Sequence, residues 1–167
     1  MKLIPFVPKI LLTDTRRKPI MEIATDESGE PLLDEKHQPV KRQASLVQRE
    51  LFVQRLDDPQ LVQGKEPRAA AKFSNALYDA IEAQSDELVE TRGGWVFEDE
   101  HAEAICRVVR KGPAPTQQNP TGGYNMAIMH NLEPHFDAVE NVRPWKDPTA
   151  EAKPNGAEKA QPEVAHA

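Results

Sequence analysis

The stretch Pro67–Lys111, PRAAAKFSNALYDAIEAQSDELVETRGGWVFEDEHAEAICRVVRK, carries the clearest fold signals in this 167-residue chain. Its first residue is a proline, which suits the first position of a helix because the amide hydrogen it lacks would have no partner there. Phe73, Leu77 and Ile81 then follow at helical spacing. We therefore predict a long amphipathic helix in the first half of the stretch.

The end of the same stretch predicts a second helix, from about Asp99 to Lys111. Acidic residues open it, basic residues close it and Gly112 follows, an order that complements the helix dipole and supplies a C-terminal cap. Ile105 lies on its apolar face beside the only cysteine of the chain, Cys106. We interpret this cysteine as a small buried hydrophobe and not as a nucleophile.

Between these two helices the sequence predicts a short central hairpin. Residues 87–90 and 95–98 resemble strands, and the turn between them, Thr91–Gly94, ends in two glycines that can supply positive φ. We expect Trp95 and Phe97 to lie on one face of the second strand, because side chains two residues apart share a face.

Ahead of the stretch, residues 1–43 predict an extended N-terminal arm that contains a β-hairpin. Two apolar segments, residues 10–12 and 19–23, flank a polar turn at residues 13–18. Prolines in this region cannot donate ladder hydrogen bonds, so its strands should be short or lie at an edge, where a strand can pair with another chain. The first 23 residues hold five bases and two acids, a net charge of +3.

A third helix is predicted just after the arm. Ser45 and Gln48 have the spacing of a capping box, and apolar residues follow as far as Leu56, so we expect a helix from Ser45 to about Leu56. Together with the two helices above, it forms a predicted helical core domain over residues 44–111.

The C-terminal third of the chain is predicted to be less regular. Residues 112–124 form a linker rich in proline and glycine, and residues 125–142 form an amphipathic helix that Pro134 kinks or divides. Residues 143–167 are rich in alanine and proline and predict a disordered tail whose start Trp145 can anchor. The predicted fold class is α+β and mainly helical, with an N-terminal hairpin, three to four helices, one central hairpin and a disordered tail.

The composition argues against several functional classes. The chain has 15 prolines, a net charge of −6, a mean hydropathy of −0.65 and a pI near 5.4. Nucleic-acid-binding domains usually have a basic face and a high pI, so the acidic balance opposes that role. No apolar run approaches the roughly 20 residues of a membrane helix, and prolines interrupt the N-terminal apolar residues, so we predict a cytoplasmic protein without a signal peptide.

One strongly acidic segment is the main candidate for partner binding. Seven acids and one base lie between residues 85 and 103, a local charge of −6. A basic partner surface would complement it, and the basic arm of a second copy is one example. A solvated face that complements the helix dipole explains the same residues without a partner. The candidate partner-binding residues are Glu98, Asp99, Glu100, Glu103, Arg16, Arg17 and Trp145.

The sequence predicts no catalytic, cofactor-binding or metal-binding residues, and it shows no evident internal repeat. His130 and His135 lie near Glu133 and Asp137, but their spacing matches no metal motif. Neither Gly-Gly pair lies in a phosphate-binding loop, and no nucleophile motif is present. A small-molecule substrate is therefore not indicated.

The order of parts resembles that of small proteins encoded among the virion and assembly genes of tailed bacteriophages. One of these parts is an aromatic and acidic entry, WVFEDEHAEAICRVV at residues 95–109, that leads into a short helix, and the resemblance rests mainly on residues 96–109. It implies a place in the host cytoplasm or in a virion, and it assigns no functional residue.

Three functional hypotheses follow from the sequence. The first is a non-enzymatic interaction or assembly protein, a bacteriophage virion component for example, which binds protein partners or further copies of itself. The second is an acidic regulatory or inhibitor protein that binds a basic partner surface. The third is a metal-dependent enzyme that uses the two histidines at positions 130 and 135.

Overall fold

The computed structural model describes residues 1–148 and shows an α+β fold. Helices cover 39% of it, so "mainly helical" overstates the helix content of the chain. Several small antiparallel sheets make up the rest of its regular structure. The strands are β1 (Lys2–Pro5), β2 (Ile10–Leu11), β3 (Met21–Ile23), β4 (Lys41–Gln43), β5 (Ser45–Leu46), β6 (Gly94–Phe97) and β7 (Arg143–Pro144). The helices are α1 (Gln48–Gln54), α2 (Pro67–Glu82), α3 (Asp86–Arg92), α4 (Asp99–Lys111), the 3₁₀ helix η1 (Met126–Asn131) and α5 (Glu133–Glu140).

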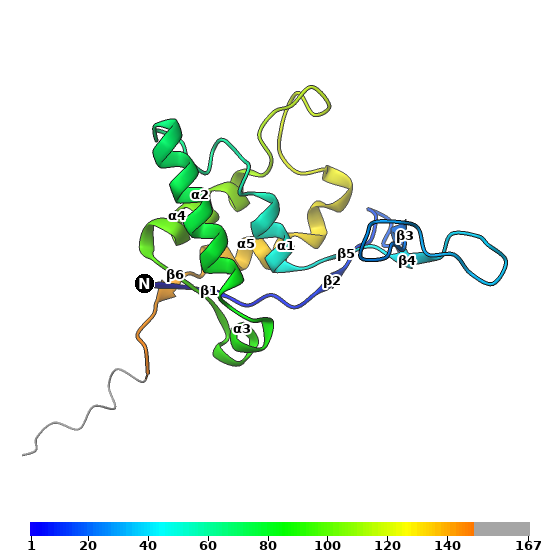
Figure 1. Cartoon of the computed structure of the whole chain (residues 1–167), viewed down its shortest axis with the longest axis horizontal. Coiled ribbons are helices and arrows are strands. Elements are labelled where there is room, and N and C mark those ends of the chain that lie inside the picture. Colours follow the sequence, from blue (N-terminus) through cyan, green and yellow to red (C-terminus); the bar gives the residue numbers. More distant parts are fainter. Residues whose placement is uncertain (149–167) are drawn as a thin grey trace, which may run out of the picture.

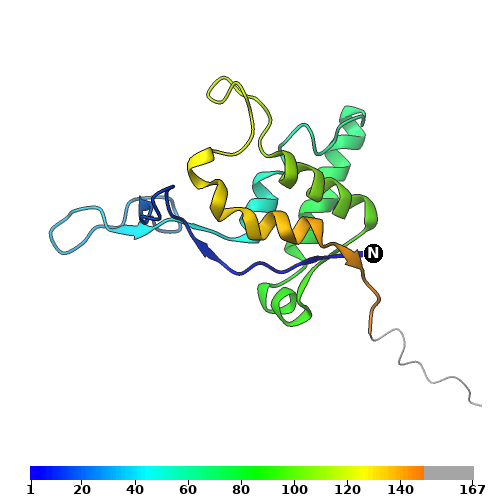
Figure 2. The same cartoon turned by 180° about the vertical axis from the view of Figure 1, so that it is seen from behind.

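The chain consists of a body and a protruding arm. The body comprises residues 1–9 and 47–148, and the arm comprises residues 10–46. Figures 1 and 2 show from opposite sides that the arm, with strands β2 to β5, extends away from the helices. All the fully buried large side chains belong to the body.

A three-stranded antiparallel sheet in the order β6-β1-β7 organises the body. Strand β1 lies in its centre and pairs Ile4 with Trp95 and Pro5 with Gly94. A side chain at position 94 would place its Cβ atom 2.3 Å from the carbonyl oxygen of Ile4, so only glycine allows this close approach. Helices α4 and α5 pack against β1 and against each other.

The predicted central hairpin is wrong in its first strand. Residues 86–92 form helix α3, which Ser85 caps by accepting a hydrogen bond from the Leu88 amide (3.2 Å). Gly93 ends the helix with a φ of 80°, and the strand that follows pairs with β1 and not with residues 87–90. The strand that pairs with β6 is therefore β1, at the N-terminus, and not the neighbouring segment that the hairpin prediction assigned. Trp95 and Phe97 do share a face, with ring planes 4° from parallel.

The predicted capping box is also absent. Ser45 belongs to strand β5, and α1 begins only at Gln48 and ends at Gln54. The Gln48 side chain is 1% exposed, and its Oε1 accepts hydrogen bonds from the Val7 amide and the Trp95 Nε1–H, both at 2.9 Å. Its Nε2 donates to the carbonyl of Pro5 (3.0 Å). These contacts across the core replace the local cap.

The two helices predicted from the stretch Pro67–Lys111 are confirmed with their apolar faces buried. Helix α2 begins at Pro67 and buries the predicted stripe, and α4 runs over the predicted residues with Gly112 at its end. Cys106 is buried, and burial raises the pKa of its thiol to about 11, so the thiol is protonated at neutral pH.

The predicted C-terminal helix is divided at the expected place. Residues 126–131 form η1, and α5 begins at Glu133 with Pro134 in its first turn. The predicted tail begins too early, because Arg143–Pro144 is strand β7, paired with β1. The remainder of the predicted disordered tail, residues 149–167, lies outside the described residues.

Candidate functional site

The arm is a branched structure built around two rings of backbone hydrogen bonds. In the first ring the Leu12 amide donates to Ala44 O (2.8 Å), the Ala44 amide to Ile20 O (2.7 Å) and the Ile20 amide to Leu12 O (3.0 Å). Two β ladders and one hairpin turn meet at this ring. The ladders are the β2-β5 and β3-β4 pairs, and the turn covers residues 13–19. The predicted N-terminal hairpin is therefore right in its turn and wrong in its strands.

A second ring repeats this arrangement further along the arm. Ala24 donates to Val40 O, Val40 to Leu32 O and Leu32 to Ala24 O, each at 2.8 Å. The β3-β4 pair enters this ring from one side, and two further hairpin turns, over residues 25–31 and 33–39, leave it. Each ring contains one buried alanine and two larger, more exposed aliphatic residues.

The three hairpin turns share a nine-residue pattern that the sequence interpretation missed. It occurs at residues 12–20, 24–32 and 32–40, with aspartate third and proline eighth. In each copy the aspartate Oδ1 accepts hydrogen bonds from two backbone amides, and the sixth residue has a positive φ. The arm thus contains an internal repeat, held together by turn chemistry and not by a core.

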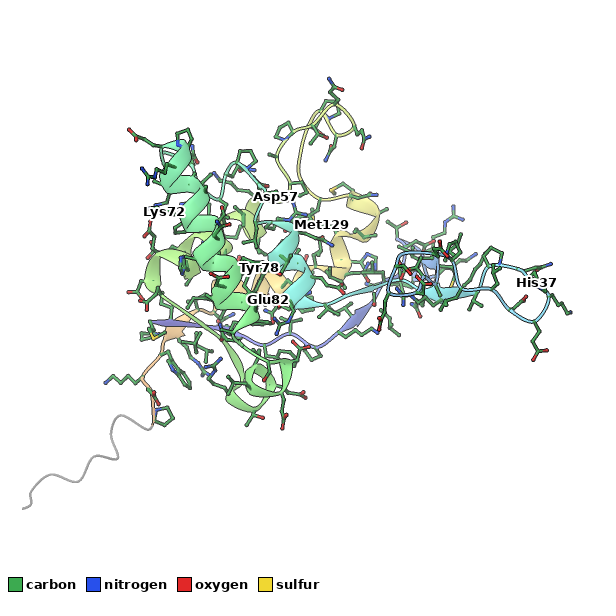
Figure 3. The ribbon with its side chains drawn as sticks, viewed as in Figure 1. His37, Asp57, Lys72, Tyr78, Glu82 and Met129 are labelled. Carbon is green, nitrogen blue, oxygen red and sulfur yellow. The ribbon has the colours of Figure 1, made fainter. Side chains whose placement is uncertain are left out.

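The arm exposes an unusual share of apolar side chains. Six of the ten large hydrophobic residues that the described chain exposes lie on it. Between residues 21 and 42 only Ala24 is buried. Figure 3 shows side chains extending into solvent around this part of the arm, with His37 marking its far end. The six are Leu11 (54% exposed), Met21 (52%), Ile23 (48%), Leu32 (45%), Leu33 (55%) and Val40 (37%).

The base of the arm is fixed to the body. The Asn131 side chain accepts a hydrogen bond from the Thr13 amide (3.2 Å) and donates to the Thr13 carbonyl (2.8 Å). His130 Nε2 lies 2.9 Å from the Thr13 hydroxyl. Through these contacts, helix η1 holds the first hairpin turn in a defined position relative to the body.

Charge is unevenly distributed along the arm. The turn at residues 13–19 holds Arg16, Arg17 and Lys18 against one acid, a net charge of +2. The turn at residues 25–31 holds three acids and no base, a net charge of −3. The predicted partner-binding residues Arg16 and Arg17 are exposed in the first of these turns.

The predicted acidic site at the start of α4 is largely neutralised within the chain. The carboxylate of Asp99 lies 3.1 Å from the N-terminal ammonium group of Met1, and Glu103 accepts a hydrogen bond from Lys2 at 2.7 Å. Lys65 donates to Glu100, and this contact lowers the pKa of the Glu100 carboxyl. Glu98 is exposed at the N-cap position of α4.

Trp145 is held on the body, apart from the arm residues. Its amide donates to the carbonyl of Met1 (3.0 Å), and the Arg92 guanidinium lies 5.6 Å from the centre of its ring. Of the predicted site residues, Arg16 and Arg17 therefore lie on the arm. Trp145 and three of the four acids, Asp99, Glu100 and Glu103, make contacts within the body.

The two histidines of the metal hypothesis lie in different surroundings. His130 faces Thr13, whereas His135 is buried and neither of its ring nitrogens has a hydrogen-bond partner among the described residues. Within residues 1–148 no three histidine, cysteine or acidic side chains come close enough to hold a metal ion. None of the helices in that range is long and apolar enough to cross a membrane.

A groove of about 700 Å³ lies between α4, the loop before η1, and α5. Its lining mixes apolar side chains such as Met126, Met129 and Phe136 with charged residues of α4 and α5. Figure 3 labels Met129 on η1, near the base of the arm. No nucleophile with a paired base lines this groove.

No known family model, curated protein sequence or solved structure matches the chain.

Proposed function

We propose that this protein is a non-enzymatic interaction or assembly protein that binds its protein partners through the arm. The main observation in support of this proposal is that exposed apolar side chains are concentrated on residues 21–40, a segment without a hydrophobic core of its own. Large apolar side chains gathered on one exposed element are typical of surfaces that another protein covers. The sequence resemblance suggests the assembly of a bacteriophage virion as the setting.

Two further features support this role. The arm is fixed at its base by Asn131 and held in shape by its backbone rings, so its shape is defined before a partner binds. Such preorganisation reduces the entropy that binding would otherwise cost. The turns also carry charges of both signs, which give a partner orientation as well as affinity.

The inhibitor hypothesis has less support. Three of its four acidic residues at the start of α4, namely Asp99, Glu100 and Glu103, already contact a cation of the same chain. A basic partner would have to displace these cations. The enzyme hypothesis draws on two histidines that face different surroundings, and no observation favours it.

Replacing the arm by a tight turn tests the proposal. The Leu12 amide donates to Ala44 O at the end of the β2-β5 ladder, so Asn-Gly in place of residues 13–43 would join these two residues as a two-residue hairpin. None of residues 11–45 belongs to the hydrophobic core of the body, so the body should stay folded. We expect the full chain to form oligomers or complexes in light-scattering measurements, and the shortened chain to lose them.

A matched control removes apolar surface from the body only. Tyr78 and Leu88 are 44% and 45% exposed, comparable to the arm residues, and changing both to serine should leave association intact. Circular dichroism checks that each variant is folded. A shortened chain that associates as strongly as the full chain, or a full chain that stays a monomer with every candidate partner tested, would contradict the proposal.

A further inference from the structure

Strand β3 in the arm has one unpaired edge. It pairs with β4 on one side, and no other strand of the described chain pairs with it. All three of its residues are exposed. An exposed strand edge is a template for pairing with another chain, unless a charge, a proline or a covering element protects it.

The register of the β3-β4 pair shows which backbone groups face that edge. Ala24 donates to Val40, and Ala44 donates to Ile20, so these are hydrogen-bonded positions of the ladder. Hydrogen-bonded and non-hydrogen-bonded pairs alternate along an antiparallel ladder. The pair at Glu22 is therefore hydrogen-bonded as well, and the amides and carbonyls of the residues on either side of it, at positions 21 and 23, point toward the free edge.

The side chains of β3 also have two distinct faces. Met21 and Ile23, two residues apart, project on the same face, and both are about half exposed. Glu22 projects on the other face, where its carboxylate accepts a hydrogen bond from Arg42 at 2.8 Å. On one face of the short ribbon Met21 and Ile23 therefore lie along the free edge, beside Gln43 and Lys41 of β4, and the other face carries a neutralised ion pair.

The turns at the two ends of β3 have opposite charge. The turn before it, residues 13–19, has a net charge of +2, and the turn after it, residues 25–31, has a net charge of −3. If two copies of β3 run antiparallel, the basic turn of each copy lies beside the acidic turn of the other. Both contacts are then attractive, as two-fold symmetry requires of a self-complementary surface.

We propose that the arm binds a second copy of this chain by antiparallel pairing of the two β3 edges. This inference rests on the proposed function and names its partner. Centred on Glu22, the pairing sets Met21 of each copy opposite Ile23 of the other, with two backbone hydrogen bonds at each of these pairs. The sheet becomes four-stranded, in the order β4-β3-β3-β4. The two Glu22 side chains meet at the centre, each already paired with Arg42.

A charge exchange between the two turns tests the pairing. The first variant carries Arg16→Glu and Lys18→Glu, which changes the basic turn from +2 to −2. The second carries Glu27→Lys and Glu30→Lys, which changes the acidic turn from −3 to +1. These substitutions leave Asp14, Arg17 and Asp26, whose side chains or backbone shape the turns, unchanged.

Sedimentation velocity should show a dimer for the natural chain and at least about tenfold weaker dimerisation for each variant alone, because like charges then oppose each other. Mixing the two variants should restore a dimer, because opposite charges meet again at both contacts. A body control, Arg68→Glu with Lys72→Glu on the exposed face of α2, makes the same charge change as the first variant and should not affect dimerisation.

A further variant tests the backbone contact itself. Met21→Pro removes an amide that points to the free edge while leaving the hydrogen bonds between β3 and β4, so it should weaken the dimer and preserve the arm. A natural chain that stays monomeric at every concentration would overturn the inference, as would equal dimerisation of all the variants. If arm replacement still abolished binding of another protein in either case, the proposed function would stand.

Discussion

Gln48→Leu should lower the free energy of unfolding by about 4 kcal/mol, because it leaves buried polar groups without partners. The Gln48 side chain alone satisfies the Val7 amide and the Trp95 indole N–H, and it donates to the Pro5 carbonyl. Each unsatisfied buried group costs about 1–3 kcal/mol. Such a loss is a large part of the 5–15 kcal/mol that stabilises a typical domain.

Urea unfolding followed by tryptophan fluorescence measures this change, since Trp95 lies in the core. Gln54→Leu provides the matched control, because Gln54 lies on the same helix and is exposed. We expect the control to change stability by less than about 0.5 kcal/mol. Equal stability of the two variants would show that Gln48 does not join α1 to the sheet in the way the structure indicates.

The second large effect concerns pH. His135 is 1% exposed, and burial lowers the pKa of its imidazole from 6.5 to about 4. Between these two values the unfolded chain binds a proton that the folded chain does not. The contribution of this group to stability is therefore fully present above pH 6.5, falls as the pH decreases, and is lost below about pH 4. The total loss in the free energy of unfolding is on the order of 3 kcal/mol.

The variant His135→Leu isolates this contribution from that of the carboxylates. It removes a buried imidazole that has no hydrogen-bond partner among the described residues, so at pH 7 it should be at least as stable as the natural chain. Urea midpoints measured from pH 7 to pH 4 should fall less steeply for the variant. Parallel curves for the two proteins would contradict the assignment.

Local signals were sufficient to predict α2, α4 and the division of the C-terminal helix. Helix α2 has a proline at its first position and a regular apolar stripe, and α4 has acids, bases and a terminal glycine in the expected order. The division at Pro134 also follows from a single residue. These features depend on neighbours within a few turns of helix, which a sequence displays directly.

The sheet pairings depended on residues far apart, and their prediction failed. Strand β6 pairs with β1, more than eighty residues earlier in the chain. Ser45 and Gln48 have the three-residue spacing of a helix capping box, but the Gln48 side chain forms its hydrogen bonds across the core. The arm repeat was missed because its nine-residue unit fixes only an aspartate and a proline. The spacing of those two residues was the signal that could have found it.

Part of the candidate site could be predicted and part could not. The basic turn with Arg16 and Arg17 was identified from charge, and the arm from its prolines. The exposure of Met21 and Ile23 could not be inferred, because alternating apolar residues usually indicate a strand with one buried face. Only the branched shape of the arm, which projects from the body, leaves both exposed.

Hydrogen exchange of the full chain in its associated and dissociated states tests most directly the claim that the arm is the interaction surface. We predict that on association the arm amides of residues 20–32 exchange more slowly, those of Met21 and Ile23 most of all, while amides of α2 are unchanged. Unchanged exchange throughout the arm, with new protection confined to the helices of the body, would contradict the account.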